Sequence, residues 1–322
     1  MLKAKLKTLM VASVAAFAAL GGQAVAQDNY PSKAITLIVP YAPGGTTDLI
    51  GRALADGMSK HLNQTVVVEN KPGAAGSMGA NEMVNTKPDG YRVALTPVGI
   101  FRQPYLQKTR YEPIKDLTYV AAFANYDFAI AVDEKSPIKT IQDYVKFIQE
   151  NPDKMDFGTP GQFTGNQVVL VELATAVNGK AVHIPFKSDS ESISALLGGQ
   201  IQSVVSTNVI IPFMESGKVR VLATAAAERP EAYKDVPTLK EAGYPVVVPS
   251  PLGLAGPKNL PENIVLKLEE AVKATMETEH FKKVMKDYGV QTKFMDHKEY
   301  GALAEETFKN EKSIVERLGK EN

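Results

Sequence analysis

Three times in this chain, a run of strand-forming residues ends in a glycine-rich turn from which a helical pattern begins. The turns lie in VPYAPGGTTDLIGR (39–52), VVVENKPGAAGSMGA (66–80) and MDFGTPGQFTGNQVV (155–169). Glycine lets backbone approach a ligand closely, and a helix begins with unpaired amides that attract an anion. Tight turning and capping would explain any one of these turns. Three in one chain indicate a small-anion site, most simply for a carboxylate.

Continuous β-rich runs alternate with helical patterns along the chain. ITLIV (35–39) and TVVVEN (65–70) have the character of strands buried on both faces, and the apolar residues between them recur at helical spacing, at Ile50, Leu54, Met58 and Leu62. Further strands are predicted at 91–96, 128–132, 155–159, 181–186, 201–207 and 219–225, and helices at 141–151, 168–177, 190–199 and after Pro261. Asp296 and Glu299 form a capping-box pattern for a last helix running toward Gly319. This alternation predicts an α/β fold with largely parallel sheets flanked by helices.

The first 26 residues have the pattern of a cleavable secretory signal peptide. Lys3, Lys5 and Lys7 precede an apolar stretch at 9–20 that is too short to span a bilayer. Residues 24–26, Ala-Val-Ala, are a small-residue cleavage signal. We therefore expect export and a mature chain that begins near Gln27, rather than a cytosolic N-terminal helix.

Composition excludes several classes of function. The chain has 322 residues and is 44% hydrophobic, as in globular proteins, and no later stretch could form a transmembrane helix. The chain has 36 basic and 36 acidic residues, and loss of the three leader lysines would give the mature protein a net charge of −3. The sequence contains no stripe of basic residues, which argues against nucleic-acid binding. The absence of cysteine removes disulfides, thiol catalysis and cysteine metal sites.

The sequence also offers no catalytic or metal constellation. The four histidines, His61, His183, His280 and His297, show no metal-ligand spacing, and His183 is expected to pack within a strand. Ser77 lies in AGSMG, which lacks the first glycine of a G-x-S-x-G nucleophile motif. We therefore predict no enzyme activity, no metal and no cofactor.

The glycine turns and other stretches resemble the Bug-type periplasmic binding proteins, the solute receptors of tripartite tricarboxylate transporters. The further matching stretches are YPSKAITLIVP (30–40), KPDGY (87–91), LLGGQI (196–201), AAERP (226–230), VPTLKEAGYP (236–245) and LGLAGPKNLP (252–261). They span nearly the whole chain after the leader. The resemblance implies a type II-like Venus flytrap of two α/β domains with a hinge cleft. Domain 1 would comprise residues 27–124 plus 226–322, and domain 2 residues 125–225.

The resemblance also implies which residues hold the ligand. Two glycine loops of domain 1 would bind one carboxylate, and the loop at 159–167 would close on it from domain 2. The implied contacts of domain 1 are Tyr41, Gly44, Gly45, Thr46, Thr47, Asp48, Ala74, Gly76 and Ser77, with Thr96 and Pro97 lining the cleft. Those of domain 2 are Thr159, Gly161, Gln162, Phe163, Thr164, Asn166 and Ser206. Asp48 either caps its helix or orients ligand waters.

Three departures from the family pattern bear on the ligand. Phe163 and Gln167 replace a glycine and a histidine of the third loop, and the phenyl group either walls the pocket against an apolar or aromatic ligand or packs under the loop. Ser206 replaces an aspartate, which disfavours a ligand with an ammonium group. Arg102 either reaches a second carboxylate by a bidentate contact or lies at the surface.

Together these features predict a monomeric periplasmic receptor for a small carboxylate, either a di- or tricarboxylate or an aromatic acid. It would deliver the ligand to the membrane subunits of a tripartite tricarboxylate transporter. One alternative is a periplasmic sensor that docks on a membrane signalling protein. A less favoured alternative is a secreted hydrolase on the same fold.

Overall fold

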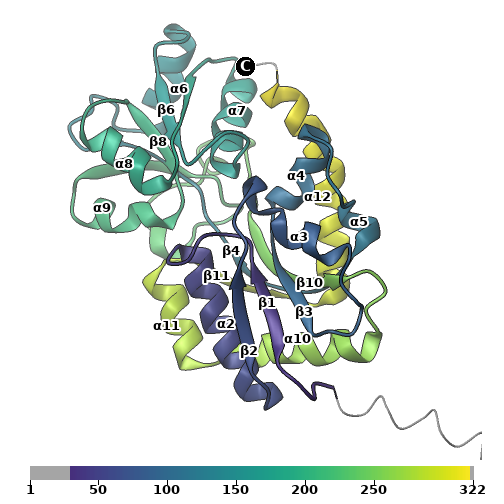
Figure 1. Ribbon diagram of the computed structural model, residues 1–322. Helices are drawn as coiled ribbons and strands as arrows, with labels where there is room; N and C mark the ends of the chain where they lie inside the picture. Colours follow the sequence, from purple (N-terminus) through teal and green to yellow (C-terminus); the bar gives the residue numbers. More distant parts are fainter. Residues whose placement is uncertain (1–29, 320–322) are drawn as a thin grey trace, which may run out of the picture.

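The computed structural model describes residues 30–319, which form two β-sheets with helices on both faces (Figure 1). The first sheet contains, in spatial order, β11 (Gln291–Met295), β4 (Leu117–Asn125), β10 (Pro251–Pro257), β3 (Arg92–Pro97), β1 (Ile35–Val39) and β2 (Val66–Asn70). The second contains β7 (Val182–Pro185), β6 (Asp156–Thr159), β8 (Ser203–Ser206), β5 (Ala129–Asp133) and β9 (Val219–Thr224). The predicted two-domain α/β fold is confirmed. The predicted signal peptide, residues 1–26, lies outside the described residues.

Helices cover both faces of the first sheet. One face is covered by α2 (Thr46–Leu62), α10 (Glu262–Met276) and α11 (Glu279–Asp287), and the other by α3 (Met78–Met83), α4 (Gly99–Leu106) and α12 (His297–Leu318). The predicted apolar stripe of α2, Ile50, Leu54, Met58 and Leu62, lies in this core. Burying each such side chain contributes about 1.5–3 kcal/mol. The short α5 (Pro113–Asp116) leads into β4.

The second sheet is covered in the same way. On one face lie α6 (Ile141–Glu150) and α7 (Gly165–Val177), and on the other lie α8 (Asp189–Leu197) and α9 (Ile211–Glu215). Three short 3₁₀ turns, η1 (Ala74–Gly76), η2 (Asn208–Ile210) and η3 (Glu231–Tyr233), complete the elements. The capping box predicted at the start of α12 is present, because Asp296 and Glu299 each accept the other's backbone amide.

Both sheets are mixed, because antiparallel strands interrupt the mainly parallel arrangement that the sequence predicted. β1 is parallel to β2 and β3, and β6 is parallel to β7 and β8. In contrast, β10 runs antiparallel between β3 and β4, β11 is antiparallel to β4, and β5 is antiparallel to β8 and β9. The strands β4, β10 and β11 were not predicted from the sequence. The sequence of β10, PLGLAGP, is rich in proline and glycine, and only pairing with neighbours on both sides makes it a strand.

The chain passes between the sheets at two places, from β4 to β5 and from β9 to β10. The predicted domain limits at 125 and 226 fall at these crossings and stay a prediction. Leu239, Val246 and Val248 of the second crossing pack in the core of the second sheet. In Figure 1, α12 runs beside α4 and α5 and ends near α7, and its Leu318 also belongs to the second core. Among residues 30–319, no helix has the length and apolar character that crossing a bilayer requires.

Candidate functional site

The first glycine loop joins β1 to α2, and its residues from Ala42 to Gly45 are exposed. Gly44 has a φ of +83°, which favours glycine, and Gly45 occupies the N-cap position of α2 without a side chain that caps the helix. The amides of the first turn of α2 therefore have no side-chain acceptor and suit an anion. Thr46 and Thr47 begin the helix, and the Thr47 hydroxyl lies 2.7 Å from the hydroxyl of Tyr126.

Asp48 is the internal brace of this loop. Its carboxylate accepts hydrogen bonds from the Gly44 amide at 2.9 Å, from Arg52 Nε at 3.0 Å and from Asn70 Nδ2 at 2.7 Å, and the residue is 1% exposed. Burial by itself would raise the pKa of Asp48, but the hydrogen bonds from Arg52, Gly44 and Asn70 outweigh it and hold the pKa below its ordinary value. Asp48 therefore braces the loop that leads into α2, which is nearer to the predicted capping role than to the orientation of ligand waters. Arg52 and Asn70 were not predicted.

The second loop has an unusual backbone. Ala74 and Ala75 have φ values of +46° and +50°, between Gly73 at +135° and Gly76 at +86°. Strained alanines of this kind persist only where neighbouring structure holds them, which is common at functional sites. A Cβ on Gly76 would lie 2.6 Å from the Tyr41 hydroxyl and 2.7 Å from Pro97. The first two loops and the end of β3 are therefore in close contact, and Ser77, which follows Gly76, is buried.

The third loop, between β6 and α7, is held by its own side chains. Thr159 Oγ1 donates to the Gly161 carbonyl at 2.9 Å and lies 2.6 Å from His183 Nε2. Thr164 caps α7 by accepting from the Gln167 amide, and it also donates to the Gly161 carbonyl. Gln162 is exposed. Burial lowers the pKa of His183 to about 4, so this histidine is neutral at pH 7.

Phe163 forms the tip of the third loop in a left-handed conformation, with a φ of +58°. Its amide donates to Gln167 Oε1 at 2.6 Å, so Gln167 supports the loop where relatives were expected to have histidine. The ring is half-buried and packs against the core of the second sheet. This contact favours the packing role for Phe163, and the role as a wall for an aromatic ligand stays a prediction.

Arg102 has a different task from either predicted one. Arg102 is buried and therefore does not lie at the surface. Its guanidinium is already paired with Glu311 of α12, so it is not free to bind a ligand carboxylate. Its Nη1 donates to the Phe163 carbonyl at 2.7 Å. Neither Arg102 nor Glu311 could be paired from the sequence, since they are 209 positions apart.

The remaining predicted residues are buried and paired. Thr96 is fully buried, and its Oγ1 lies 2.8 Å from the Tyr300 hydroxyl, which makes it a core contact. Asn166 donates to the Val205 carbonyl at 2.9 Å. Ser206 donates to Asp189 Oδ1 at 2.9 Å. Ser206 stands where the family pattern has aspartate, but Asp189 at the start of α8 places a carboxylate beside it. This role of Asp189 was not predicted from the sequence.

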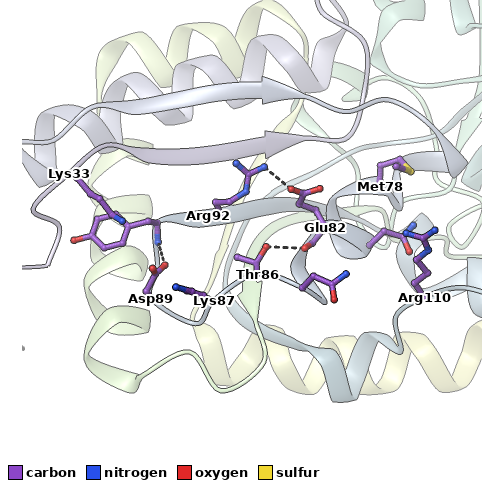
Figure 2. Close-up of a pocket in the computed structure, with 11 residues that line it drawn as sticks. Lys33, Met78, Glu82, Thr86, Lys87, Asp89, Arg92 and Arg110 are labelled. Atoms are coloured by element: carbon purple, nitrogen blue, oxygen red, sulfur yellow. Dashed lines mark hydrogen bonds and ion pairs between the residues drawn. The ribbon is translucent and has the colours of Figure 1, made fainter.

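A surface hollow of about 480 Å³ lies elsewhere, beside α3 and β3 (Figure 2). None of the predicted ligand residues lines it. Its Arg92 is paired with Glu69 at 3.0 Å and with Glu82 at 2.8 Å. We assign it no ligand. Within residues 30–319, no cluster of three or more histidine or acidic side chains is arranged to hold a metal ion.

Comparisons with known proteins agree with this architecture. Residues 50–320 match the family model of the tripartite tricarboxylate transporter family receptor. A UPF0065 protein of Cupriavidus necator is 41% identical over 302 residues, covering 94% of this chain and 92% of that protein. The structure is similar to a TctC solute-binding protein from Polaromonas, with a TM-score of 0.80, 29% identity and coverage of 90% and 100% of the two chains.

Two further solved structures are similar to this one. The periplasmic binding protein BugD is 27% identical, with a TM-score of 0.77 and coverage of 90% of this chain and 99% of its own. MatC from Rhodopseudomonas palustris, solved with bound malate, is 26% identical, with a TM-score of 0.75 and coverage of 89% and 100%. The chain therefore belongs to the Bug-type receptors of the tripartite tricarboxylate transporter family.

Proposed function

We propose that this protein is a periplasmic receptor that captures a small carboxylate and delivers it to the membrane subunits of a tripartite tricarboxylate transporter. The observation that carries the proposal is the first glycine loop, which leads into the N-terminus of α2 without a side-chain cap and contacts the strained second glycine loop through Tyr41. In both loops the residues that lead into the helix start, 42–45 and 72–75, are exposed, which suits a carboxylate held by backbone without any lysine or arginine. The malate bound to the related MatC supports this ligand class.

The proposed contacts follow the geometry of the loops. Backbone and hydroxyl donors of residues 41–47 and 74–77 would hold the carboxylate, and the loop at 159–167 would close over it. Asp48, Thr96 and Arg102 would act through their neighbours, because their side chains are already paired. Closure of the two domains on the ligand is the motion by which such receptors trap solutes.

The proposal includes a leader that is cleaved after Ala26, domain limits at 125 and 226, a monomeric mature form and no catalysis. Mass spectrometry of the protein recovered from the periplasm would identify its first residue. Light scattering would give its oligomeric state. A ligand recovered chemically unchanged after long incubation would agree with a receptor, and a converted ligand would favour the hydrolase.

The first experiment is a thermal-shift panel on residues 27–322, stripped of co-purified ligand by unfolding and refolding. The panel contains succinate, malate, citrate, adipate, benzoate, terephthalate, aspartate and glutamate. A ligand that binds only the folded protein at 100 times its Kd adds about 2.7 kcal/mol, which gives a clear shift. If no carboxylate stabilises the protein, the proposal is wrong. Deleting the gene should then abolish uptake of the identified ligand, whereas lost gene induction with normal uptake would favour the sensor.

A further inference from the structure

Polar side chains of the second sheet lie together at one edge, which here means the side formed by the strand ends nearest the first glycine loop. β5 begins at this edge and β8 and β9 end there, because Ala129 lies opposite both Ser206 and Thr224. Three residues before Ala129, the Tyr126 hydroxyl contacts Thr47 of the first glycine loop at 2.7 Å. This edge therefore lies beside the proposed carboxylate site.

Asp127 is the first acidic group at this edge, and it lacks a partner. The residue is 1% exposed, and neither carboxylate oxygen accepts a hydrogen bond from residues 30–319. Its backbone amide donates to Asn208 Oδ1 at 3.3 Å. Burial raises the pKa of Asp127 to about 7, although the neighbouring Asn208 side chain lowers it somewhat. A buried carboxyl without a partner is costly, which indicates a partner that arrives from outside.

Asp189 is the second acidic group at this edge. Its carboxylate accepts only from neutral groups, which are Ser206 Oγ at 2.9 Å, Thr207 Oγ1 at 3.0 Å and, at 3.4 Å, the Thr207 amide and Asn166 Nδ2. In the described part of the chain, no lysine, arginine or histidine lies within ion-pair distance of Asp127 or Asp189. These donors position the carboxylate but do not neutralise its charge.

Tyr233 interacts electrostatically with both Asp127 and Asp189. Its hydroxyl is buried and has no hydrogen-bond partner in the described residues. Burial, and then the charges of Asp127 and Asp189, raise the pKa of Tyr233 well above its ordinary value. The edge therefore combines two carboxyl groups, an unpartnered phenol and no cation. Desolvated negative charge of this kind favours a positively charged partner.

We propose that Asp127 and Asp189 form an anionic half of the ligand site that recognises a positively charged nitrogen. The ligand would then be a carboxylate that also carries an ammonium group, with its carboxylate on the glycine loops of the first domain. This inference rests on the proposed function and narrows its ligand class. It reverses the expectation from Ser206 that an ammonium ligand is disfavoured, because Asp189 supplies the carboxylate at that place.

The test compares matched pairs that differ in one amino group. The probes are L-aspartate against succinate, L-glutamate against glutarate and 4-aminobutyrate against butyrate, titrated by calorimetry into stripped protein. We expect at least one amino member to bind at least tenfold more tightly than its partner. If simple carboxylates bind and none of the three amino members binds more tightly than its partner, the inference is wrong and the proposed function stands. If no carboxylate of either kind binds, both fail.

Asp127→Asn and Asp189→Asn assign the effect to these residues. Each should reduce the preference for the amino member at least tenfold while leaving affinity for the simple carboxylate within about twofold. Ligand-free Asp127→Asn should also melt at a higher temperature than the natural protein at pH 8, because it removes a buried charge. The matched control is Asp156→Asn, the same change at the far end of β6 in the same sheet. An unchanged preference in both variants, or an equal loss in the control, would overturn the assignment.

Discussion

Arg102 and Glu311 form a bidentate ion pair that is closed off from solvent. Arg102 Nε lies 2.6 Å from Glu311 Oε2, Nη2 lies 2.7 Å from Oε1, and the two side chains are 2% and 3% exposed. Since the same guanidinium also donates to the Phe163 carbonyl, one side chain joins α4, α12 and the third glycine loop. The pair thus connects the packing of the first domain to the backbone of a proposed ligand loop.

Breaking this pair should be costly. In Arg102→Met, Glu311 is left charged and buried without a partner, and such a loss typically costs about 3–5 kcal/mol. The free energy of unfolding in urea measures it. The control is Arg317→Met, which breaks the Arg317–Glu172 pair between α12 and α7, whose side chains are 32% and 25% exposed. A pair that is open to solvent is worth about 1 kcal/mol or less, so this partly exposed pair should cost much less than the buried one. Equal costs in the two variants would contradict the role given to burial.

Two glycines of the proposed site should respond differently to valine. At Gly45 a Cβ would meet nothing nearer than the Ala42 carbonyl at 3.7 Å, and the φ of −79° suits any residue. Gly45→Val should therefore fold normally and lose carboxylate binding at least tenfold, because it blocks the start of α2. Gly76→Val should unfold more easily by about 2 kcal/mol or more, because of its positive φ and the contact with Tyr41. Thermal unfolding and calorimetry on both variants separate the two effects, and normal binding by Gly45→Val would refute the account of the first loop.

Thr96 should matter for stability and not for the ligand. The Tyr300 hydroxyl contacts Thr96 Oγ1 at 2.8 Å and donates to the Thr96 carbonyl at 3.1 Å, inside the core. Thr96→Val keeps the shape of the side chain but leaves the buried Tyr300 hydroxyl with one partner fewer. It should lower the free energy of unfolding by about 1–2 kcal/mol. Ligand affinity should stay within about twofold of the natural value. A larger loss of affinity would return Thr96 to the list of ligand contacts.

His183 should make the stability depend on pH below neutrality. Burial lowers the pKa of His183 from 6.5 to about 4 in the folded protein. Between these values the unfolded chain binds a proton that the folded protein does not, so the stability due to His183 is present above pH 6.5 and falls as the pH drops toward 4. His183→Gln can keep a contact with Thr159 and should lose stability less steeply between pH 7 and pH 4.5. Urea midpoints at several pH values measure this difference, and identical slopes in the two proteins would contradict it.

Elements with strong local signals could be predicted from sequence. β1 was predicted at 35–39 and forms there, the stripe of α2 is buried, and the capping box of α12 is made by the two predicted residues. Apolar spacing and capping depend on residues only a few positions apart, so they are visible in the chain. β10 and β4 gave weaker signals because their strand character comes from pairing with each other along most of their length.

By itself, the sequence determined the repeated local segments of this protein, each a strand followed by a glycine turn and a helix. It also predicted that the unpaired amides at these helix starts suit an anion. Only the tertiary structure decided which side chains meet at those turns. It paired Arg102 with Glu311, set Asp189 against Ser206 and placed Thr96 on Tyr300, across separations of 209, 17 and 204 positions. Such pairs depend on how helices and sheets pack around a common core. No local spacing or propensity encodes that packing, because its energy comes from contacts that exist only once the chain has folded.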